Sequence, residues 1–394
     1  MTRAPLVVVL LAPSEERSFS LDRKVAGLSV PLRIALIGQA SGARAIHLAS
    51  GAASLRSALV DARLKIPVVE EPPPDDAICI ELRADVVVHR GLFTALADGV
   101  TDGRARFIGA DAAAVIARPP AIARASGGPP APLVFAPPFG FSPIAVHTSR
   151  DARRATTALL RSLRKTQDGW TSTHLNRYVS LAVTRVLLHT PIRPNQLSVA
   201  ILFIGLSAGI VAAAGDCVSL ILGAALLHTQ SVLDGCDGEI SRVTHRGSRL
   251  GEWLDTIGDD LSNYGFFAGA SYGLYRVTAW PGYLAIGAVI VACGLLASGL
   301  EYRYLAKIGS GDLLKYPLGL ADEGGAPTSF VGRVAALIRP LFKRDSFVLI
   351  TFFAACLGLL GPMLAVFAVG AIGIVVAVIK AEVRMAGERR AGGA

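Results

Sequence analysis

Four aspartates lie at helical spacing in the stretch DGCDGEISRVTHRGSRLGEWLDTIGDD. Asp234 and Asp237 are three residues apart, and Asp255 and Asp259 are four residues apart. On a helix, either spacing places both side chains on one face. Carboxylates gathered in one pocket repel each other unless a cation lies among them, and ligands that are all oxygen favour a hard divalent cation. The pattern therefore predicts a site for Mg²⁺ or Mn²⁺, with two ions expected.

Small residues and an arginine lie between the acids. The small residues are Gly235, Gly238, Gly247 and Gly251. Residues of this size let a bulky ligand or a neighbouring helix approach the backbone closely. Arg242 is suited to binding a phosphate through two hydrogen bonds. Together these residues predict a site for a metal-bound diphosphate, where two metals can stabilise an in-line displacement at phosphorus. Solvated charges at helix ends are the simpler explanation for any single aspartate, but not for four at this spacing.

The elements that must position these acids are membrane helices. Hydrophobic residues make up 52% of the 394 residues and charged residues only 18%, below the roughly 25% of soluble chains. Six apolar stretches come close to the roughly 20 residues that cross a bilayer core. They cover about 197–214, 217–237, 248–272, 279–303, 346–361 and 362–380. The last two form one apolar block split at Gly361-Pro362, so a single kinked helix is the alternative there.

The distribution of basic residues predicts the orientation in the membrane. Arginine and lysine concentrate in the loops 238–250 and 303–345 and in the C-terminal tail. The positive-inside rule then places both termini and the acidic stretch in the cytoplasm of a multi-pass cell-membrane protein. The net charge of +9 raises the possibility of nucleic-acid binding. However, the basic residues flank apolar runs instead of forming a patch with aromatic residues, so no nucleic-acid partner is expected.

Residues 1–145 have the pattern of a cytoplasmic α/β domain with a Rossmann-like parallel sheet. Predicted strands are LVVVLLA, LRIALIG, AIHLAS, AICIEL and ADVVVH, and predicted helices are ASLRSALVDARLK and RGLFTALADG. Residues 146–195 form a basic amphipathic juxtamembrane segment expected to lie along the inner membrane surface. An all-α transmembrane bundle over 196–385 and a cytoplasmic tail over 386–394 complete the predicted organisation.

The acidic stretch resembles the signature of the CDP-alcohol phosphotransferase (CDP-alcohol phosphatidyltransferase) family. That signature reads D-x2-D-G-x2-A-R-x8-G-x3-D-x3-D, and the match runs from Asp234 through Asp259. One departure is Ser241, which stands where alanine is usual but is nearly as small. With LNRYVS, TPIRPN and the six apolar stretches, the resemblance covers about residues 168–385.

The resemblance implies a role for each matching residue. Asp234, Asp237 and Asp255 would bind two divalent metals, Mg²⁺ or Mn²⁺. Asp259 would complete the metal site and act as the general base on an acceptor hydroxyl. The CDP moiety and its diphosphate would be held by Gly238, Ser241, Arg242 and Gly251, with Asn195 at a turn nearby. The implied reaction moves a substituted phosphoryl group from a CDP-alcohol to an acceptor alcohol and releases CMP, in phospholipid or inositol phosphodiester synthesis. Membrane lipid and a second copy in a homodimer are the further partners expected.

The sequence DGCDGE behind a soluble domain resembles the fused enzymes that make and use CDP-inositol, whose head is a sugar-type nucleotidyltransferase. DRKVAGLSVPLRIALIGQASGARAIHLAS and ADVVVHRGLFTAL, with an acidic strand end at Asp85, are similar to parts of that fold. The glycine-rich loop expected after the first strand is replaced by LLAPSEERSF, so a degenerate head is expected. Two alternatives remain open. The head could make the CDP-alcohol from CTP, or the acids could form the ion site of a divalent-cation transporter, although acids at cytoplasmic helix ends fit a transporter poorly.

Several other polar residues have two explanations each. Candidates for the acceptor pocket are His228, Thr229 and Gln230, polar residues of the second apolar stretch about one turn before Asp234, although cross-helix hydrogen bonding explains them as well. Arg303, Lys307 and Arg344 are candidates for binding a phosphate on the acceptor, but membrane topology also accounts for them. Glu239 and Glu252 could support the site or could simply be solvated.

Overall fold

The computed structural model describes residues 4–13, 20–100, 105–108, 115–120, 131–132, 141–163, 171–318 and 344–391. Contacts divide the chain into two compact units. The first comprises Met1–Lys165 and Ser241–Arg246, and the second comprises Thr166–Ile240 and Gly247–Ala394. Helix α4 (Ser149–Arg161) buries Ala155 and Leu160 within the first unit, in contact with β2 and β11. The segment predicted to be juxtamembrane is thus divided between the two units.

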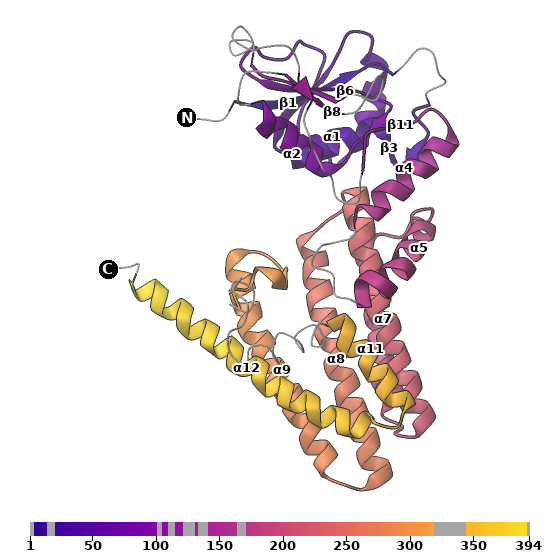
Figure 1. Cartoon of the computed structure of the whole chain (residues 1–394), viewed down its shortest axis with the longest axis vertical. Coiled ribbons are helices and arrows are strands. Elements are labelled where there is room, and N and C mark those ends of the chain that lie inside the picture. Colours follow the sequence, from indigo (N-terminus) through magenta and orange to yellow (C-terminus); the bar gives the residue numbers. More distant parts are fainter. Residues whose placement is uncertain are drawn as a thin grey trace. The chain divides into compact units, whose positions relative to one another are not determined.

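The first unit is built on a seven-stranded mixed sheet in the order β10-β8-β9-β6-β1-β4-β5 (Figure 1). Its strands are β1 (Leu6–Leu11), β4 (Ala43–Leu48), β5 (Val68–Val69), β6 (Ile78–Arg83), β8 (Arg106–Ile108), β9 (Val115–Arg118) and β10 (Ala131–Pro132). Strand β1 is parallel to both β4 and β6, and its continuous apolar run suits a strand buried on both faces. Strand β9 runs antiparallel to β6 and β8. The α/β class is therefore confirmed, but the sheet is mixed where a parallel one was predicted.

Among its described residues, the head also contains two small sheets and three helical elements. The small sheets pair β2 (Lys24–Val25) with β3 (Leu28–Ser29) and β7 (Val86–Val87) with β11 (Ile144–Ala145). The helical elements are α1 (Val30–Ala40), the 3₁₀ helix η1 (Ala53–Leu59) and α2 (Arg90–Gly99). Helix α2 has the predicted bounds, whereas η1 is shorter than the helix predicted over ASLRSALVDARLK.

The prediction of a strand at LRIALIG is wrong, because this stretch lies within α1. Pro31 occupies the first turn of the helix, where a missing backbone N–H costs nothing. Every residue from Val30 to Gly38 is buried, Arg33 included, so this part of the helix has no solvent-exposed polar face. A short apolar run of this kind cannot be assigned to a helix or a strand from periodicity.

The second unit is helical. Its elements are η4 (Ser172–Asn176), α5 (Arg177–Leu187), α6 (Pro194–Ala212), α7 (Cys217–Thr244), α8 (Arg249–Thr278), α9 (Gly282–Ile308), η5 (Leu313–Lys315), α11 (Arg344–Cys356) and α12 (Leu360–Ala391). Among the described residues, four helices are long and apolar enough to cross a membrane: α6, α7, α9 and α12. Helix α8 is longer than α6, at 30 residues against 19, but carries the acidic residues.

The apolar block near the C-terminus forms two helices and not a single kinked one. Helix α11 ends at Cys356, and Gly358 has a φ of +70°, a left-handed conformation that glycine adopts readily. The break thus precedes the predicted split at Gly361-Pro362. Pro362 lies in the first turn of α12, where proline is tolerated.

Helices α6 and α8 pack backbone to backbone through glycines. A Cβ atom built on Gly269 would lie 2.1 Å from the carbonyl oxygen of Gly209, and one built on Gly209 would lie 2.3 Å from that of Gly265. No larger residue fits at this spacing without displacing a helix. Small residues of this kind let membrane helices approach closely. This seam sets the position of α8, which carries two of the four aspartates.

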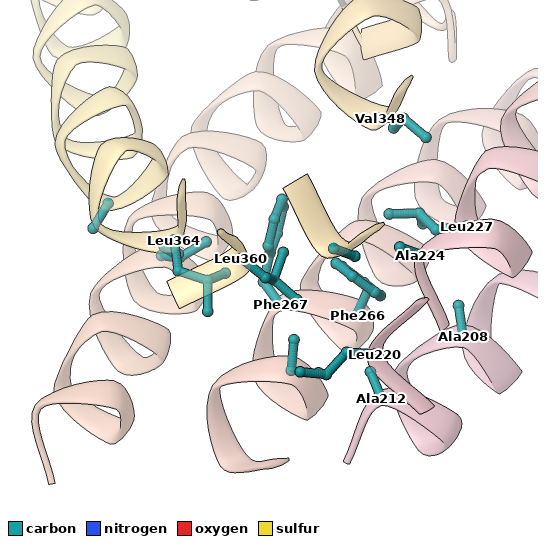
Figure 2. Close-up of a cluster of buried hydrophobic side chains, with 14 residues drawn as sticks. Ala208, Ala212, Leu220, Ala224, Leu227, Phe266, Phe267, Val348, Leu360 and Leu364 are labelled. Atoms are coloured by element: carbon teal, nitrogen blue, oxygen red, sulfur yellow. The ribbon is translucent and has the colours of Figure 1, made fainter. Parts of the chain in front are cut away.

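An apolar core packs the helices together close to the helical turns that carry the acidic residues. Figure 2 shows this cluster, drawn from α6, α7, α8, α9, α11 and α12. Its buried members are Ala208, Ala212, Leu220, Ala224, Leu227, Phe266, Phe267, Ala270, Ile290, Val348, Ala355, Leu360, Leu364 and Ala368. Leu227 precedes Gln230 by one turn of α7, and Phe266 follows Asp259 by two turns of α8. The packed core therefore fixes the helices from which the acidic side chains project.

Candidate active site

The four predicted aspartates line one pocket in the second unit. The pocket is open to solvent, and the empty space in and directly in front of it is about 180 Å³. Its lining residues are Ser198, Ile201, Leu202, Gln230, Asp234, Asp237, Leu254, Asp255, Gly258 and Asp259. They come from α6, α7 and α8, so three helices build the pocket. The helical spacing of the two pairs thus has the geometric consequence that the sequence predicted.

Arg344, the first residue of α11, binds acids from two helices. Its Nη1 donates to Oδ2 of Asp234 at 3.1 Å and also to Oδ2 of Asp259. Its Nη2 donates to Oε1 of Gln230 at 2.8 Å, and Nε2 of Gln230 donates to Oδ1 of Asp259 at 3.2 Å. Asp345 accepts a hydrogen bond of 2.7 Å from the backbone N–H of Ser172, which anchors the start of α11. Asp259 is therefore oriented by a cation and an amide.

The other two aspartates differ in their surroundings. Asp237 is 5% exposed and accepts hydrogen bonds from Oγ of Ser198 and from the backbone N–H of Gly238. Ser198 lies on α6, so this contact joins α6 to α7 at the pocket. Asp255 is exposed. The pocket thus combines three carboxylates held by hydrogen bonds with a fourth, that of Asp255, which is exposed.

The chemistry of these side chains fits divalent metal ions. Carboxylate oxygens are the ligands that Mg²⁺ and Mn²⁺ prefer. Arg344 brings one guanidinium to four carboxylates, so its charge cannot balance theirs. In the described part of the chain, no group of three or more His, Cys, Asp or Glu side chains is already arranged as a metal cage. The residues therefore fit a metal site in type and location.

Asn195 and Gly251, two residues predicted to hold the nucleotide, lie against each other. Oδ1 of Asn195 accepts a hydrogen bond of 3.3 Å from Oγ of Ser248, which in turn accepts one of 3.0 Å from the backbone N–H of Gly251. A Cβ atom on Gly251 would lie 3.0 Å from Oδ1 of Asn195. Ser248 is the N-cap of α8, so this contact joins the start of α8 to the start of α6.

The remaining predicted nucleotide residues lie along α7. Gly238 follows Asp237 directly and belongs to the second unit. Ser241 and Arg242 group with the first unit, as part of Ser241–Arg246, and neither lines the pocket of the four aspartates. At this end of α7, Arg33 donates to the carbonyl of Val243 at 2.8 Å. Within the first unit, Arg33 and Arg63 thus cap the carbonyls of residues 243 and 244.

Asp85, the predicted acidic strand end of the head, is engaged by the chain itself. Its side chain is fully buried and accepts two hydrogen bonds from Arg83, at 2.9 and 2.8 Å. Nδ1 of His147 lies 3.5 Å from the same carboxylate. In LLAPSEERSF, which replaces the glycine-rich loop, residues 14–19 lie outside the described residues.

Sequence reasoning missed Ser198 and gave too little weight to Gln230 and Arg344. Ser198 is a small polar residue in an apolar span, and Arg344 resembles any basic residue flanking a membrane helix. Only the fold brings these residues to the acids. Arg303, by contrast, pairs with Glu382 at 2.9 Å. Glu252 accepts a hydrogen bond of 3.1 Å from the backbone N–H of Gly311, so it ties α8 to the turn after α9.

Comparisons with known proteins match the helical part of the chain. Residues 191–379 match the family described as CDP-alcohol phosphatidyltransferase. Proteins named bifunctional IPC transferase and DIPP synthase are similar to parts of this chain. The one from Thermococcus kodakarensis is 36% identical over 136 residues, covering 34% of this chain and 30% of the relative. The one from Archaeoglobus fulgidus is 34% identical over 185 residues, covering 45% and 35%.

A third relative of the same name, from Rubrobacter xylanophilus, is 32% identical over 166 residues, covering 42% of this chain and 36% of the relative. The chain thus spans about a third of the length of the curated relatives that it matches. The resemblance predicted from the acidic signature is confirmed over residues 191–379, the stretch that matches the CDP-alcohol phosphatidyltransferase family.

Proposed function

We propose that this chain is an integral-membrane CDP-alcohol phosphotransferase. It transfers a substituted phosphoryl group from a donor of the CDP-diacylglycerol or CDP-inositol type to an acceptor alcohol, and it releases CMP. The observation that carries the proposal is the pocket in which Asp234, Asp237, Asp255 and Asp259 lie together. The family match over residues 191–379 supports it independently of the geometry.

In the proposed reaction, the acceptor oxygen attacks the phosphorus that bears the alcohol of the donor. A new P–O ester bond forms, the P–O bond to CMP breaks, and CMP leaves with that electron pair. The proton of the acceptor hydroxyl passes to a carboxylate oxygen of Asp259, which acts as general base. Arg344 and Gln230 hold Asp259 in place for this step. The product is a phosphodiester.

The metal ligands in this proposal are Asp234, Asp237 and Asp255, with Asp259 completing the site. Two divalent ions, Mg²⁺ or Mn²⁺, supply charge neutralisation of the diphosphate and stabilise the departing CMP when they are bound. Ser198 orients Asp237 through its hydrogen bond, and α6 thereby takes part in positioning a ligand. The exposed Asp255 is the carboxylate most open to an incoming ion.

The nucleotide and diphosphate are assigned to Gly238, Ser241, Arg242, Gly251 and Asn195. Arg242 suits the diphosphate because a guanidinium donates two parallel hydrogen bonds to phosphate oxygens. Gly251 leaves room beside Asn195, since a Cβ atom there would lie 3.0 Å from the Asn195 amide oxygen.

We further propose six membrane crossings, by α6, α7, α8, α9, α11 and α12, with both termini in the cytoplasm. The 30 residues of α8 suffice for a crossing in which the acidic face meets other helices. The 13 residues of α11 rise about 20 Å, so α11 is the shortest of the six proposed crossings. A homodimer and contacts with membrane lipid complete this part of the proposal.

The head is proposed to be a nucleotidyltransferase-like domain without catalytic activity. Supporting this, Asp85 is fully buried and bound through both oxygens by Arg83, so it is not placed to bind a metal nucleotide. The competing proposal, that the head makes the CDP-alcohol, predicts that CTP is consumed by the full-length protein.

The test is release of CMP by the purified full-length protein in detergent. The protein is incubated with Mg²⁺ or Mn²⁺ and a panel of CDP-activated donors and acceptor alcohols. We expect one donor and acceptor pair to release CMP in a metal-dependent reaction. Asp259→Asn should slow this release by about 10²- to 10⁴-fold, the usual contribution of a general base.

Asp216→Asn is the matched control, because Asp216 is an exposed aspartate directly before the first residue of α7, at the end of the helix away from the pocket. It should release CMP at the wild-type rate. Release by Asp259→Asn as fast as by the wild type would exclude Asp259 as the base. Metal uptake into liposomes without CMP release from any donor would favour the transporter and overturn the proposed reaction.

A further inference from the structure

Glu239 is a fully buried carboxylate that the proposed reaction does not use. It lies on α7, two residues after Asp237, and has no exposed surface. A buried carboxylate is costly unless hydrogen bonds and an opposite charge compensate it. Here the compensation is complete. Oε1 accepts from Nη1 of Arg177 at 2.7 Å and from Oγ of Ser180 at 2.8 Å, while Oε2 accepts from Oγ1 of Thr184 at 2.6 Å.

All three donors belong to one face of α5. Their positions, 177, 180 and 184, are separated by three and four residues, the spacing of neighbours on a helix surface. Each donor is itself buried, with exposures of 8%, 1% and 0%. Glu239 thus contacts a stripe of α5 that spans two helical turns, and the two helices are held in a fixed register.

Two further contacts extend this interface along α7 to the level of the acids. Sγ of Cys236 donates to the carbonyl of Ser180 at 3.5 Å. A Cβ atom on Gly235 would lie 3.4 Å from Cβ of Ser180, so α5 passes close to the backbone there. With about 100° between successive residues, positions 235, 236 and 239 lie on the side of α7 opposite Asp234 and Asp237. The α5 interface therefore backs the pocket face of α7.

A small roll of α7 would move the pocket acids too far for metal binding. Side chains extend about 5–6 Å from a helix axis, so a roll of about 20° would move a carboxylate by roughly 2 Å. Metal–ligand distances tolerate only about 0.2 Å. An interaction that sets the rotation of α7 thus affects metal binding without touching the pocket.

We propose that Glu239 is a positioning residue: its buried hydrogen bonds to Arg177, Ser180 and Thr184 lock α5 against α7 and set the rotation at which Asp234 and Asp237 face α8. The inference rests on the proposed metal site. It goes beyond the proposed function because Glu239, on the side of α7 that faces away from the pocket, would then contribute to metal affinity.

The test uses full-length protein in detergent and two measurements that need no substrate. Binding of Mn²⁺ is followed by electron paramagnetic resonance, and backbone hydrogen exchange is followed over residues 177–187. For Glu239→Gln we expect Mn²⁺ affinity to fall by about tenfold or more, the usual effect of losing a residue that orients a ligand. We also expect faster exchange in α5, because the buried charge of Arg177 loses its counter-ion.

Thr184→Val guards against a variant that fails to fold, because it removes one hydroxyl and keeps the shape of the side chain. It should weaken Mn²⁺ binding in the same direction but less. Glu382→Gln is the matched control: this glutamate on α12 pairs with Arg303 and Tyr316, away from α7, and its loss should leave Mn²⁺ affinity unchanged.

The two proposals fail in different ways. Wild-type Mn²⁺ affinity in both Glu239→Gln and Thr184→Val would overturn the positioning role, even if CMP is released normally. Weakened Mn²⁺ binding together with faster exchange in α5 would support that role, even if no donor in the panel releases CMP. Equal losses of affinity in Glu239→Gln and Glu382→Gln would reduce Glu239 to a general contributor to stability and also overturn it.

Discussion

The head and the helical unit differ in how fully the charges of their buried or partly buried carboxylates are balanced by neighbouring arginines. In the head, fully buried Asp85 is matched by Arg83, which binds both of its oxygens. In the helical unit, Asp234 and Asp259 share the single guanidinium of Arg344 in a pocket that holds four carboxylates. A carboxylate whose partners come from the chain itself stabilises the fold. Carboxylates that outnumber the cation beside them have capacity left for a ligand.

Glu239 shows that the distinction does not depend on the unit. It lies on the same helix as Asp234 and Asp237, yet its oxygens are fully used by donors from α5. Acids on opposite sides of one helix therefore have different roles. What separates them is the number and charge of the donors that the neighbouring helix presents.

The largest effect that tests this contrast is expected at Asp85. Asp85→Asn leaves Arg83 without a counter-ion, and breaking a buried ion pair by removing one partner costs about 3–5 kcal/mol. We expect the head to unfold at lower denaturant concentration, measured by protease sensitivity of the full-length protein. The CMP released per folded molecule should be unchanged.

Glu70→Gln is the matched control in the head, because the Arg56–Glu70 pair is about half exposed on both sides. Its effect on the head should stay below about 1 kcal/mol. Loss of CMP release in Asp85→Asn at full stability would contradict the contrast, since it would give the head acid a chemical role.

A smaller effect of a different kind is expected at Asp255. Metal that binds only the folded protein raises its stability, by about 2.7 kcal/mol at a concentration 100 times the dissociation constant. The wild type should therefore melt at a higher temperature in Mn²⁺ than in a chelator. Asp255→Asn should lose most of this difference, while its melting temperature in chelator should not fall, because one of four mutually repelling charges is gone.

In the same melting experiment, the head variant Asp85→Asn should show the opposite pattern to Asp255→Asn. It should melt early in chelator but keep the stabilisation of the helical unit by Mn²⁺. If Asp255→Asn kept the full metal response, Asp255 would not be a ligand.

The parts of the structure that were predicted depend on short-range spacing. The acidic pairs were read correctly as neighbours because positions three or four apart always meet on a helix. Helix α2 was predicted with its bounds because its polar and apolar residues alternate with helical period. In each case the necessary information lies within a few turns of one element.

The parts that were missed depend on which faces meet in three dimensions. Helix α1 is buried on all sides, so its sequence holds no periodic signal. Ser198 became part of the site because α6 packs closely against α7, where a Cβ atom on Gly223 would lie 2.7 Å from the carbonyl oxygen of Ala208. Likewise, nothing in the sequence around Glu239 indicates that three donors on α5 will surround it. These contacts join residues far apart in the chain, and local pattern cannot specify them.

The smallest expected effect is at Asp61. Comparing Asp61 with Asp85 tests whether burial or hydrogen-bond geometry sets the contribution of such an ion pair to stability. In the head, Arg63 binds Asp61 through both oxygens, at 2.7 Å each, with the same two-residue separation as Arg83 and Asp85. The difference is exposure: both side chains of this pair are 22% exposed, whereas Asp85 is fully buried. Because solvent screens such pairs, we expect Asp61→Asn to cost less than about 1 kcal/mol.

The pH dependence of this cost has a defined sign. The hydrogen bond from the Arg63 side chain lowers the pKa of Asp61 from its ordinary value of 3.8 to about 2. A carboxyl whose pKa is lowered by folding stabilises the protein above the unfolded value and loses that effect as pH falls through the folded one. The stability difference between wild type and Asp61→Asn should therefore be constant above pH 5 and shrink between about pH 4 and pH 2. A difference as large as that of Asp85→Asn, or one that grows on acidification, would show that geometry and not burial sets the contribution of these pairs.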